Sequence, residues 1–97
     1  MDIKYKTICG DEGVAVIARW TDRRIRVARF NSDGSYRVSF WRAIDKGDNP
    51  DRIVSVSTDR RHHAANTELE LSNEAMIALG TCIAMIGEMR QAGGCKS

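Results

Sequence analysis

A short turn signal in the first half of the chain constrains its fold more than any other feature. Residues 31–35 read Asn-Ser-Asp-Gly-Ser, and the Asp33-Gly34 pair supplies the positive φ angles that a tight hairpin turn demands. On both sides, over residues 24–30 and from Tyr36 to about Ile44, apolar residues alternate with polar or cationic ones. This pattern predicts two antiparallel strands joined as a hairpin.

Further strands are predicted on either side of this hairpin. Residues 14–20 are rich in β-branched side chains, which favour extended backbone. Pro50 lies in a polar loop, because proline cannot donate a ladder hydrogen bond, and residues 53–58 resume as a strand. We expect an exposed loop at residues 59–66, and a short fifth strand at residues 67–71. We therefore expect an antiparallel sheet of four to five strands.

One long helix follows the predicted sheet. Ser72 is a natural N-cap for it, and the run of apolar residues that follows extends to about Gln91. Gly93 and Gly94 end the helix, because glycine adopts the left-handed conformation of a helix C-terminus without strain. The sequence thus predicts an α+β fold in which the C-terminal helix packs on one face of the sheet.

The size and composition of the chain fit a single globular domain. Its 97 residues can bury one core and hardly two, and hydrophobic and charged fractions of 42% and 29% are those of ordinary folded proteins. We expect one domain over residues 1–97, in which about residues 92–97 form a flexible tail.

The termini and the cysteines predict a cytoplasmic location. The first residues lack the apolar stretch of a secretory signal, and the longest nearly apolar run, residues 75–87, is too short to cross a bilayer. Cys9, Cys82 and Cys95 are an odd number of cysteines at unrelated spacings, which argues against a disulfide framework. Cys82 is read as a buried apolar residue and Cys95 as an exposed thiol.

The alternation of side chains along each strand assigns the two faces of the sheet. Residues on the face toward the helix, together with one side of the helix, form the expected core: Ile17, Ile25, Val27, Val38, Phe40, Leu79, Ile83 and Ile86. The opposite face is cationic and carries one large aromatic residue. Its candidate binding residues are Arg19, Arg24, Arg26, Arg37 and Trp41.

This cationic surface has two interpretations. Guanidinium groups beside an aromatic ring suit single-stranded nucleic acid, because cations contact phosphates and any base can stack on a ring. Arginines on the open face of a sheet also occur as an ordinary solvated surface that discourages strands of other chains from pairing at the edge. The net charge of +2 is too small to decide between the two.

The predicted helix is apolar on nearly all sides, so packing one face of it on the sheet cannot bury all of its apolar side chains. Gly80, Ala84 and Gly87 form a stripe of small residues that would let a second helix approach closely, which predicts a homodimer. The alternative is that this stripe lies over the sheet of its own subunit. Either arrangement would explain two glycines inside a helix, where each costs up to about 1 kcal/mol relative to alanine.

No catalytic or metal-binding motif is recognisable in the sequence. His62 and His63 are adjacent in a predicted loop, where neighbouring side chains diverge, and their spacing from the cysteines matches no zinc site. The sequence contains no phosphate-binding loop, nucleophile elbow or dinucleotide-binding fingerprint. We therefore expect neither an enzyme nor a bound cofactor or metal.

Two functions from different classes remain open. The first is a non-enzymatic accessory protein that binds single-stranded nucleic acid through the basic face. The second is a small protein of phage or mobile-element type that binds and inhibits a host nucleic-acid enzyme or defence complex, because Arg and Trp are also favoured at protein interfaces. The predicted order of elements resembles that of dimeric single-stranded DNA-binding coactivator domains, in which a basic curved sheet holds the strand and the helix forms the dimer. That resemblance lies in topology alone and gives no residue a role.

Overall fold

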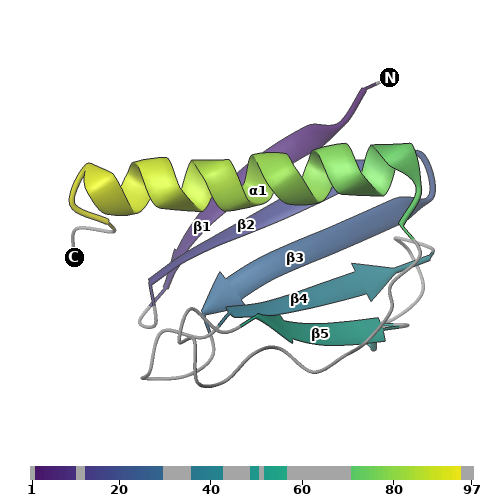
Figure 1. Ribbon diagram of the computed structural model, residues 1–97, viewed down its shortest axis with the longest axis horizontal. Coiled ribbons are helices and arrows are strands. Elements are labelled where there is room, and N and C mark those ends of the chain that lie inside the picture. The colour runs from purple at the N-terminus through teal and green to yellow at the C-terminus, as the bar shows by residue number, and fades with distance from the viewer. Residues whose placement is uncertain are drawn as a thin grey trace.

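A computed structural model of the chain describes residues 2–10, 13–29, 36–42, 49–50, 52–56 and 71–94. Within them the strands pair in chain order, each antiparallel to the next, and one helix lies across one face of the sheet (Figure 1). The helix contacts mainly β2 and β3. The predicted α+β fold is confirmed. The elements are β1 (Lys4–Gly10), β2 (Gly13–Trp20), β3 (Arg23–Arg29), β4 (Tyr36–Trp41), β5 (Arg52–Val56) and α1 (Asn73–Gln91).

The predicted strands correspond to β2, β3, β4 and β5, with small differences at their ends. The first strand of the sheet, β1, was not predicted, although its residues Lys-Tyr-Lys-Thr-Ile-Cys alternate as a strand does. The fifth strand expected at residues 67–71 falls largely outside the described residues, and Leu71 itself lies outside any strand. The turn at residues 31–35 and the loop at residues 59–66 also lie outside them.

Both ends of α1 follow their sequence signals. At the start, the backbone N–H of Ala75 donates to the Ser72 side-chain oxygen at 3.2 Å, which is the expected N-cap. At the other end, Gly93 and Gly94 have φ angles of 109° and 71°, in the region that glycine adopts most readily. Their N–H groups donate to carbonyl oxygens of the last helical turn, which satisfies groups that would otherwise lack partners.

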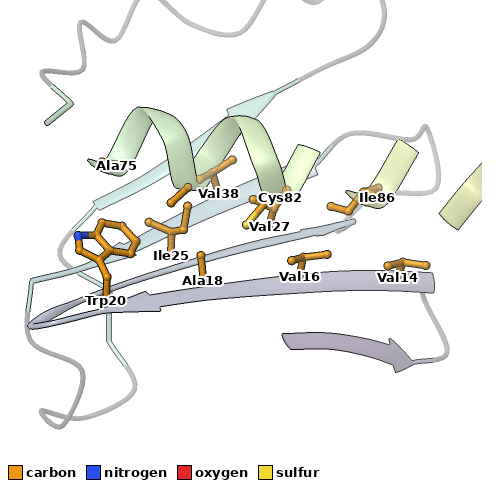
Figure 2. Close-up of a cluster of buried hydrophobic side chains, with 11 residues drawn as sticks. Val14, Val16, Ala18, Trp20, Ile25, Val27, Val38, Ala75, Cys82 and Ile86 are labelled. Carbon is orange, nitrogen blue, oxygen red and sulfur yellow. The ribbon is translucent and has the colours of Figure 1, made fainter. Parts of the chain in front are cut away.

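The core lies between the helix and the face of the sheet that α1 covers (Figure 2). Alternate residues of β2 point into it, and Val16 and Ala18 have no exposed surface. Ile25 and Val38 were predicted core residues, and they are 1% and 2% exposed. The complete cluster comprises Val14, Val16, Ala18, Trp20, Ile25, Val27, Val38, Ala75, Ala78, Cys82 and Ile86, with Phe40 and Leu79 partly buried against it.

Two predicted core residues are wrong. Ile17 lies on the face of the sheet turned away from α1, because its neighbours Val16 and Ala18 occupy the covered face. Residues 14–18 are apolar at every position, so their alternation alone could not assign the face. Ile83 is 51% exposed on the helix. The helix turns small residues toward the sheet instead, among them Ala75, Ala78 and Cys82, which permits a close approach of the backbones.

The bonding state of the cysteines differs from the prediction at one position. Cys9, in β1, is disulfide-bonded, so the argument against a disulfide framework is wrong there. Cys82 is a free thiol in the core, as predicted. Cys95 lies outside the described residues. Because the cytoplasmic location was inferred partly from the cysteines, it stays a prediction. In the described part of the chain, no helix is long and apolar enough to cross a membrane.

Burial makes Cys82 a probe of stability at alkaline pH. Loss of water around the thiol raises the pKa of Cys82 from 9.0 to about 11. Above pH 9 the unfolded chain releases this proton while the folded chain keeps it, so rising pH favours unfolding. We expect a loss of roughly 2–3 kcal/mol from this group between pH 9 and 11, by linkage between proton release and unfolding. Denaturant unfolding across that range checks it, and a Cys82→Ala variant with an equally steep decline would contradict it.

Candidate nucleic-acid interface

The face of the sheet turned away from α1 collects basic residues from four neighbouring strands. Strand pairing fixes which side chains stand side by side, because directly opposed residues of antiparallel strands project from the same face. We call this surface the cationic face. Its basic residues are Lys4 and Lys6 of β1, Arg19 of β2, Arg24 and Arg26 of β3, and Arg37 of β4.

One row across this face is formed almost entirely by cations. Lys4 stands opposite Arg19, and Arg19 stands opposite Arg24. The next residue in the row is Trp41 on β4. Neighbouring strands lie about 4.8 Å apart, so three positively charged side chains emerge from adjacent backbones. This row is the closest grouping of positive charge that the register of the sheet produces.

A second row crosses the middle of the face and mixes charge with apolar surface. It runs from Lys6 through Ile17, Arg26 and Ser39 to Ile53. Lys6 and Arg26 are exposed, and the Ile53 side chain at the β5 edge is 51% exposed. Phosphates and the apolar faces of bases would therefore both find partners along this row.

The predicted arginines share one face, as the sequence indicated. Arg19, Arg26 and Arg37 are exposed, and Arg24 is partly buried. Arg37 stands opposite Ala28, one row further from Trp41 than Arg26. Sequence reasoning missed Lys4 and Lys6, because it did not recognise the strand that carries them. The alternation of lysine with apolar and neutral residues at positions 4–9 is the signal that could have identified both.

Trp41 differs from its expected role. It lies on the predicted face, opposite Arg24, but only 9% of it is exposed, so it is not an open platform for a base. The Arg24 guanidinium carbon lies 4.1 Å from the centre of the Trp41 ring, a cation–π contact that covers one side of the indole. The expectation that Trp41 is exposed is therefore wrong.

The Arg24–Trp41 pair leaves two hydrogen-bond donors without an acceptor. In the part of the chain that the structure describes, neither Nε of Arg24 nor Nε1 of Trp41 has a partner, and both atoms are buried. A buried donor without a partner costs about 1–3 kcal/mol, more when it is charged. Both groups donate only, so what they lack is an acceptor oxygen.

The charge of the cationic face is not balanced within the sheet. Every charged residue in the five described strands is lysine or arginine. No carboxylate among the described residues forms a salt bridge with Lys4, Arg19 or Arg26. Like charges directly opposite each other across strands are destabilising, so the row of three cations lowers the stability of the free protein. A polyanion bound across the row would remove that cost.

A hollow on the cationic face offers a place for a base. It has a volume of about 290 Å³ and lies where β1, β2 and β3 carry glycine and alanine. Ala15 and Ala28 form its floor, and the longer side chains of Ile8 and Arg26 border it. Ile8 is 36% exposed there. A base can lie against an aliphatic side chain or stack on a guanidinium plane, so Arg26 and Ile8 replace Trp41 as candidates for base contact.

A second exposed surface lies on α1. We call it the outer helix surface, and it includes all three residues of the predicted dimer contact, which are exposed. A methyl group built at Gly80 or Gly87 meets no atom within 4 Å, so these glycines do not pack on their own sheet. The alternative in which the small stripe covers the sheet is therefore wrong. The outer helix surface consists of Met76, Ile77, Gly80, Ile83, Ala84 and Gly87.

No metal centre is found among the described residues, which contain no group of three or more potential ligands. His62 and His63 lie outside the described residues. That the protein is not an enzyme and needs no cofactor stays a prediction. No protein-family model matches the chain, and comparisons with curated proteins and with solved structures also give no match. The functional argument therefore depends on the geometry of the chain itself.

Proposed function

We propose that the protein binds single-stranded nucleic acid through the cationic face and catalyses no reaction. The observation that carries the proposal is the row of directly opposed cations, Lys4, Arg19 and Arg24, in a sheet whose described strands contain no carboxylate. The phosphate backbone supplies the negative charge that such a row lacks. The hollow beside Arg26 gives an unpaired base a place to lie, which favours a single strand over a duplex.

Replacing Arg19 tests the proposal, because this residue has a basic residue opposite it on both sides. We expect Arg19→Gln to raise the free energy of unfolding by roughly 0.2–1 kcal/mol, because it removes two like-charge pairs. The same change should weaken binding to all single strands alike. It should also reduce the slope of log affinity against log salt by about 0.7, the value for one phosphate contact. Chemical denaturation and fluorescence anisotropy with a labelled oligonucleotide measure the two effects.

Arg90→Gln is the matched control, because it removes the same charge from an exposed position on α1. It should leave the salt slope unchanged. If both variants reduce the slope equally, binding follows net charge and not the cationic face, and the proposal is wrong.

We further propose that the outer helix surface joins two copies of the chain. Met76, Ile77 and Ile83 are each about half exposed there, and Gly80 and Gly87 leave open space beside them. Large apolar side chains around small residues allow two helices to pack closely, and burial of such surface stabilises a dimer. The cationic face lies on the other side of the sheet from α1 and stays free in such a dimer.

The dimer is tested by a change at the middle of the outer helix surface. Ala84→Arg should give a monomer, because a long charged side chain blocks the close approach of two helices. The fold should be unaffected, since Ala84 is exposed. Sedimentation equilibrium of both proteins over a range of concentrations gives the masses. A parent protein that stays monomeric at the highest concentration contradicts the dimer. The apolar surface would then favour the second candidate function, a small phage or mobile-element protein that binds and inhibits a host protein.

A further inference from the structure

The disulfide of Cys9 has a partner that follows from the cysteines of the chain. The sequence contains three cysteines, Cys9, Cys82 and Cys95. Cys9 is disulfide-bonded, whereas Cys82 is a free thiol in the core. The structure holds a single chain, so Cys95 is the one cysteine left to pair with Cys9. Cys95 directly follows Gly94, where the described part of the chain ends.

The position of Cys9 places this disulfide at the end of α1. Cys9 stands opposite Val14 in the pairing of β1 with β2, so both side chains project from the face that α1 covers. Val14 and Ile86 belong to one core cluster, and both lie at the same end of it (Figure 2). The helix ends shortly after Ile86, and the two-glycine turn that follows comes directly before Cys95. The disulfide therefore connects the end of α1 with β1.

This cross-link closes almost the whole fold into one covalent ring. Its loop runs from residue 9 to residue 95 and contains α1 and the strands β2 to β5. A cross-link over so long a loop restricts the unfolded chain and favours the folded state. β1 depends on it most, because it is an edge strand with β2 as its main described neighbour, and only Tyr5 in it is partly buried. Segments with so little burial open locally most easily.

The disulfide is open to a reductant, whereas the free thiol is not. Cys9 is exposed, so a dithiol in solution reaches its disulfide. Cys82 is fully buried, and burial raises the pKa of Cys82 to about 11, so it stays a thiol and does not exchange with the disulfide. Reduction therefore breaks one S–S bond. The dithiol supplies two electrons and two protons, leaves Cys9 and Cys95 as thiols, and is itself oxidised to a disulfide.

We propose that the Cys9–Cys95 disulfide is a redox switch that holds β1 in the sheet when oxidised and releases it when reduced. β1 carries Lys4 and Lys6 of the cationic face and Ile8 beside the hollow, so release of β1 weakens the binding of a single strand. The effect on strand binding rests on the proposed function, whereas the effect on β1 does not.

Peptide mapping of protein equilibrated with oxidised glutathione tests the pairing. Trypsin digestion without reduction should yield residues 7–19 linked to residues 91–96, and dithiothreitol should separate the two peptides. An alkylating reagent should modify Cys82 only after unfolding, because this thiol is buried. A disulfide that includes Cys82, or alkylation of both Cys9 and Cys95 in the folded oxidised protein, overturns the proposal.

Hydrogen exchange and thermal unfolding of the oxidised and reduced protein test the switch. Reduction with dithiothreitol should speed exchange of the β1 amides roughly 10-fold or more and lower the Tm by roughly 10–20 °C. Cys82→Ala should keep both differences. Cys9→Ser combined with Cys95→Ser should behave as the reduced protein under either condition. Equal exchange and equal melting of the oxidised and reduced parent protein overturn the proposal.

Fluorescence anisotropy with a labelled oligonucleotide separates the switch from the proposed function. At about 50 mM salt the reduced protein should bind roughly 5- to 50-fold more weakly, approaching the loss of the two phosphate contacts of Lys4 and Lys6. Equal affinity of the two forms overturns the switch and leaves the proposed function intact. If neither form binds, the proposed function fails, and hydrogen exchange still decides whether reduction releases β1.

Discussion

Replacing Ile25 with alanine is expected to lower the free energy of unfolding by about 2–5 kcal/mol. Ile25 is 1% exposed and lies in the middle of the cluster between β3 and α1, so truncation removes apolar contacts and leaves a cavity. A domain of this size has a total stability of roughly 5–15 kcal/mol, so the change could remove much of it. Urea denaturation followed by circular dichroism measures the difference.

Ile83→Ala is the matched control for this prediction. It removes the same atoms from a side chain that is 51% exposed on α1, and alanine is the better helix former. Measured in the Ala84→Arg background, so that no dimer contact contributes, both substitutions can be compared, and we expect Ile83→Ala to change the free energy of unfolding by no more than about 0.5 kcal/mol, as for surface substitutions in general. Equal losses of unfolding free energy in the two variants would show that Ile83 also packs in the core, so that the side of α1 facing the sheet has been assigned wrongly.

The sequence predicted the elements that carry strong local signals. The helix was found from its ends, because Ser72 and the Gly93-Gly94 pair act on their own backbone. The side chains of β3 and β4 were assigned to the correct faces, because apolar and cationic residues alternate there. These assignments depend only on residues close together in the sequence, which is why the structure agrees with them.

Features that depend on tertiary packing were not predictable from the sequence. In β2 both faces are apolar, so only contact with α1 decides that Val16 is core and Ile17 is not. The exposure of Trp41 depends on Arg24, which lies on another strand and covers its ring. A pocket of about 420 Å³ at the end of the sheet where α1 begins combines residues that are distant in the chain, among them Trp20, Arg52 and Ser72. No local pattern indicates that these three come together.

Removing three cations of the cationic face together is expected to have the largest effect on binding. Lys4→Gln, Arg19→Gln and Arg26→Gln combined remove three phosphate contacts without touching the core, because all three side chains are exposed. At about 50 mM salt this should weaken single-strand binding roughly 100- to 1,000-fold and reduce the salt slope by about 2. Fluorescence anisotropy with a labelled oligonucleotide measures both quantities.

Stability of the triple variant supplies the internal check. The free protein should unfold at the same or a higher denaturant concentration than the parent, because the opposed cations Lys4 and Arg19 no longer repel each other. A variant that has lost binding because it has unfolded is recognised by this measurement. A folded triple variant that binds as tightly as the parent would place the binding surface elsewhere on the molecule.

The most direct test of the central claim is the affinity of the unaltered protein for a single strand as salt is varied. If the cationic face contacts the phosphate backbone, log affinity falls linearly with log salt, and about five contacts give a slope of roughly −3.5. A duplex of the same sequence should bind more weakly, because its bases cannot reach the hollow beside Arg26. Absence of binding at about 50 mM salt, or an affinity that does not change with salt, would contradict the proposed function.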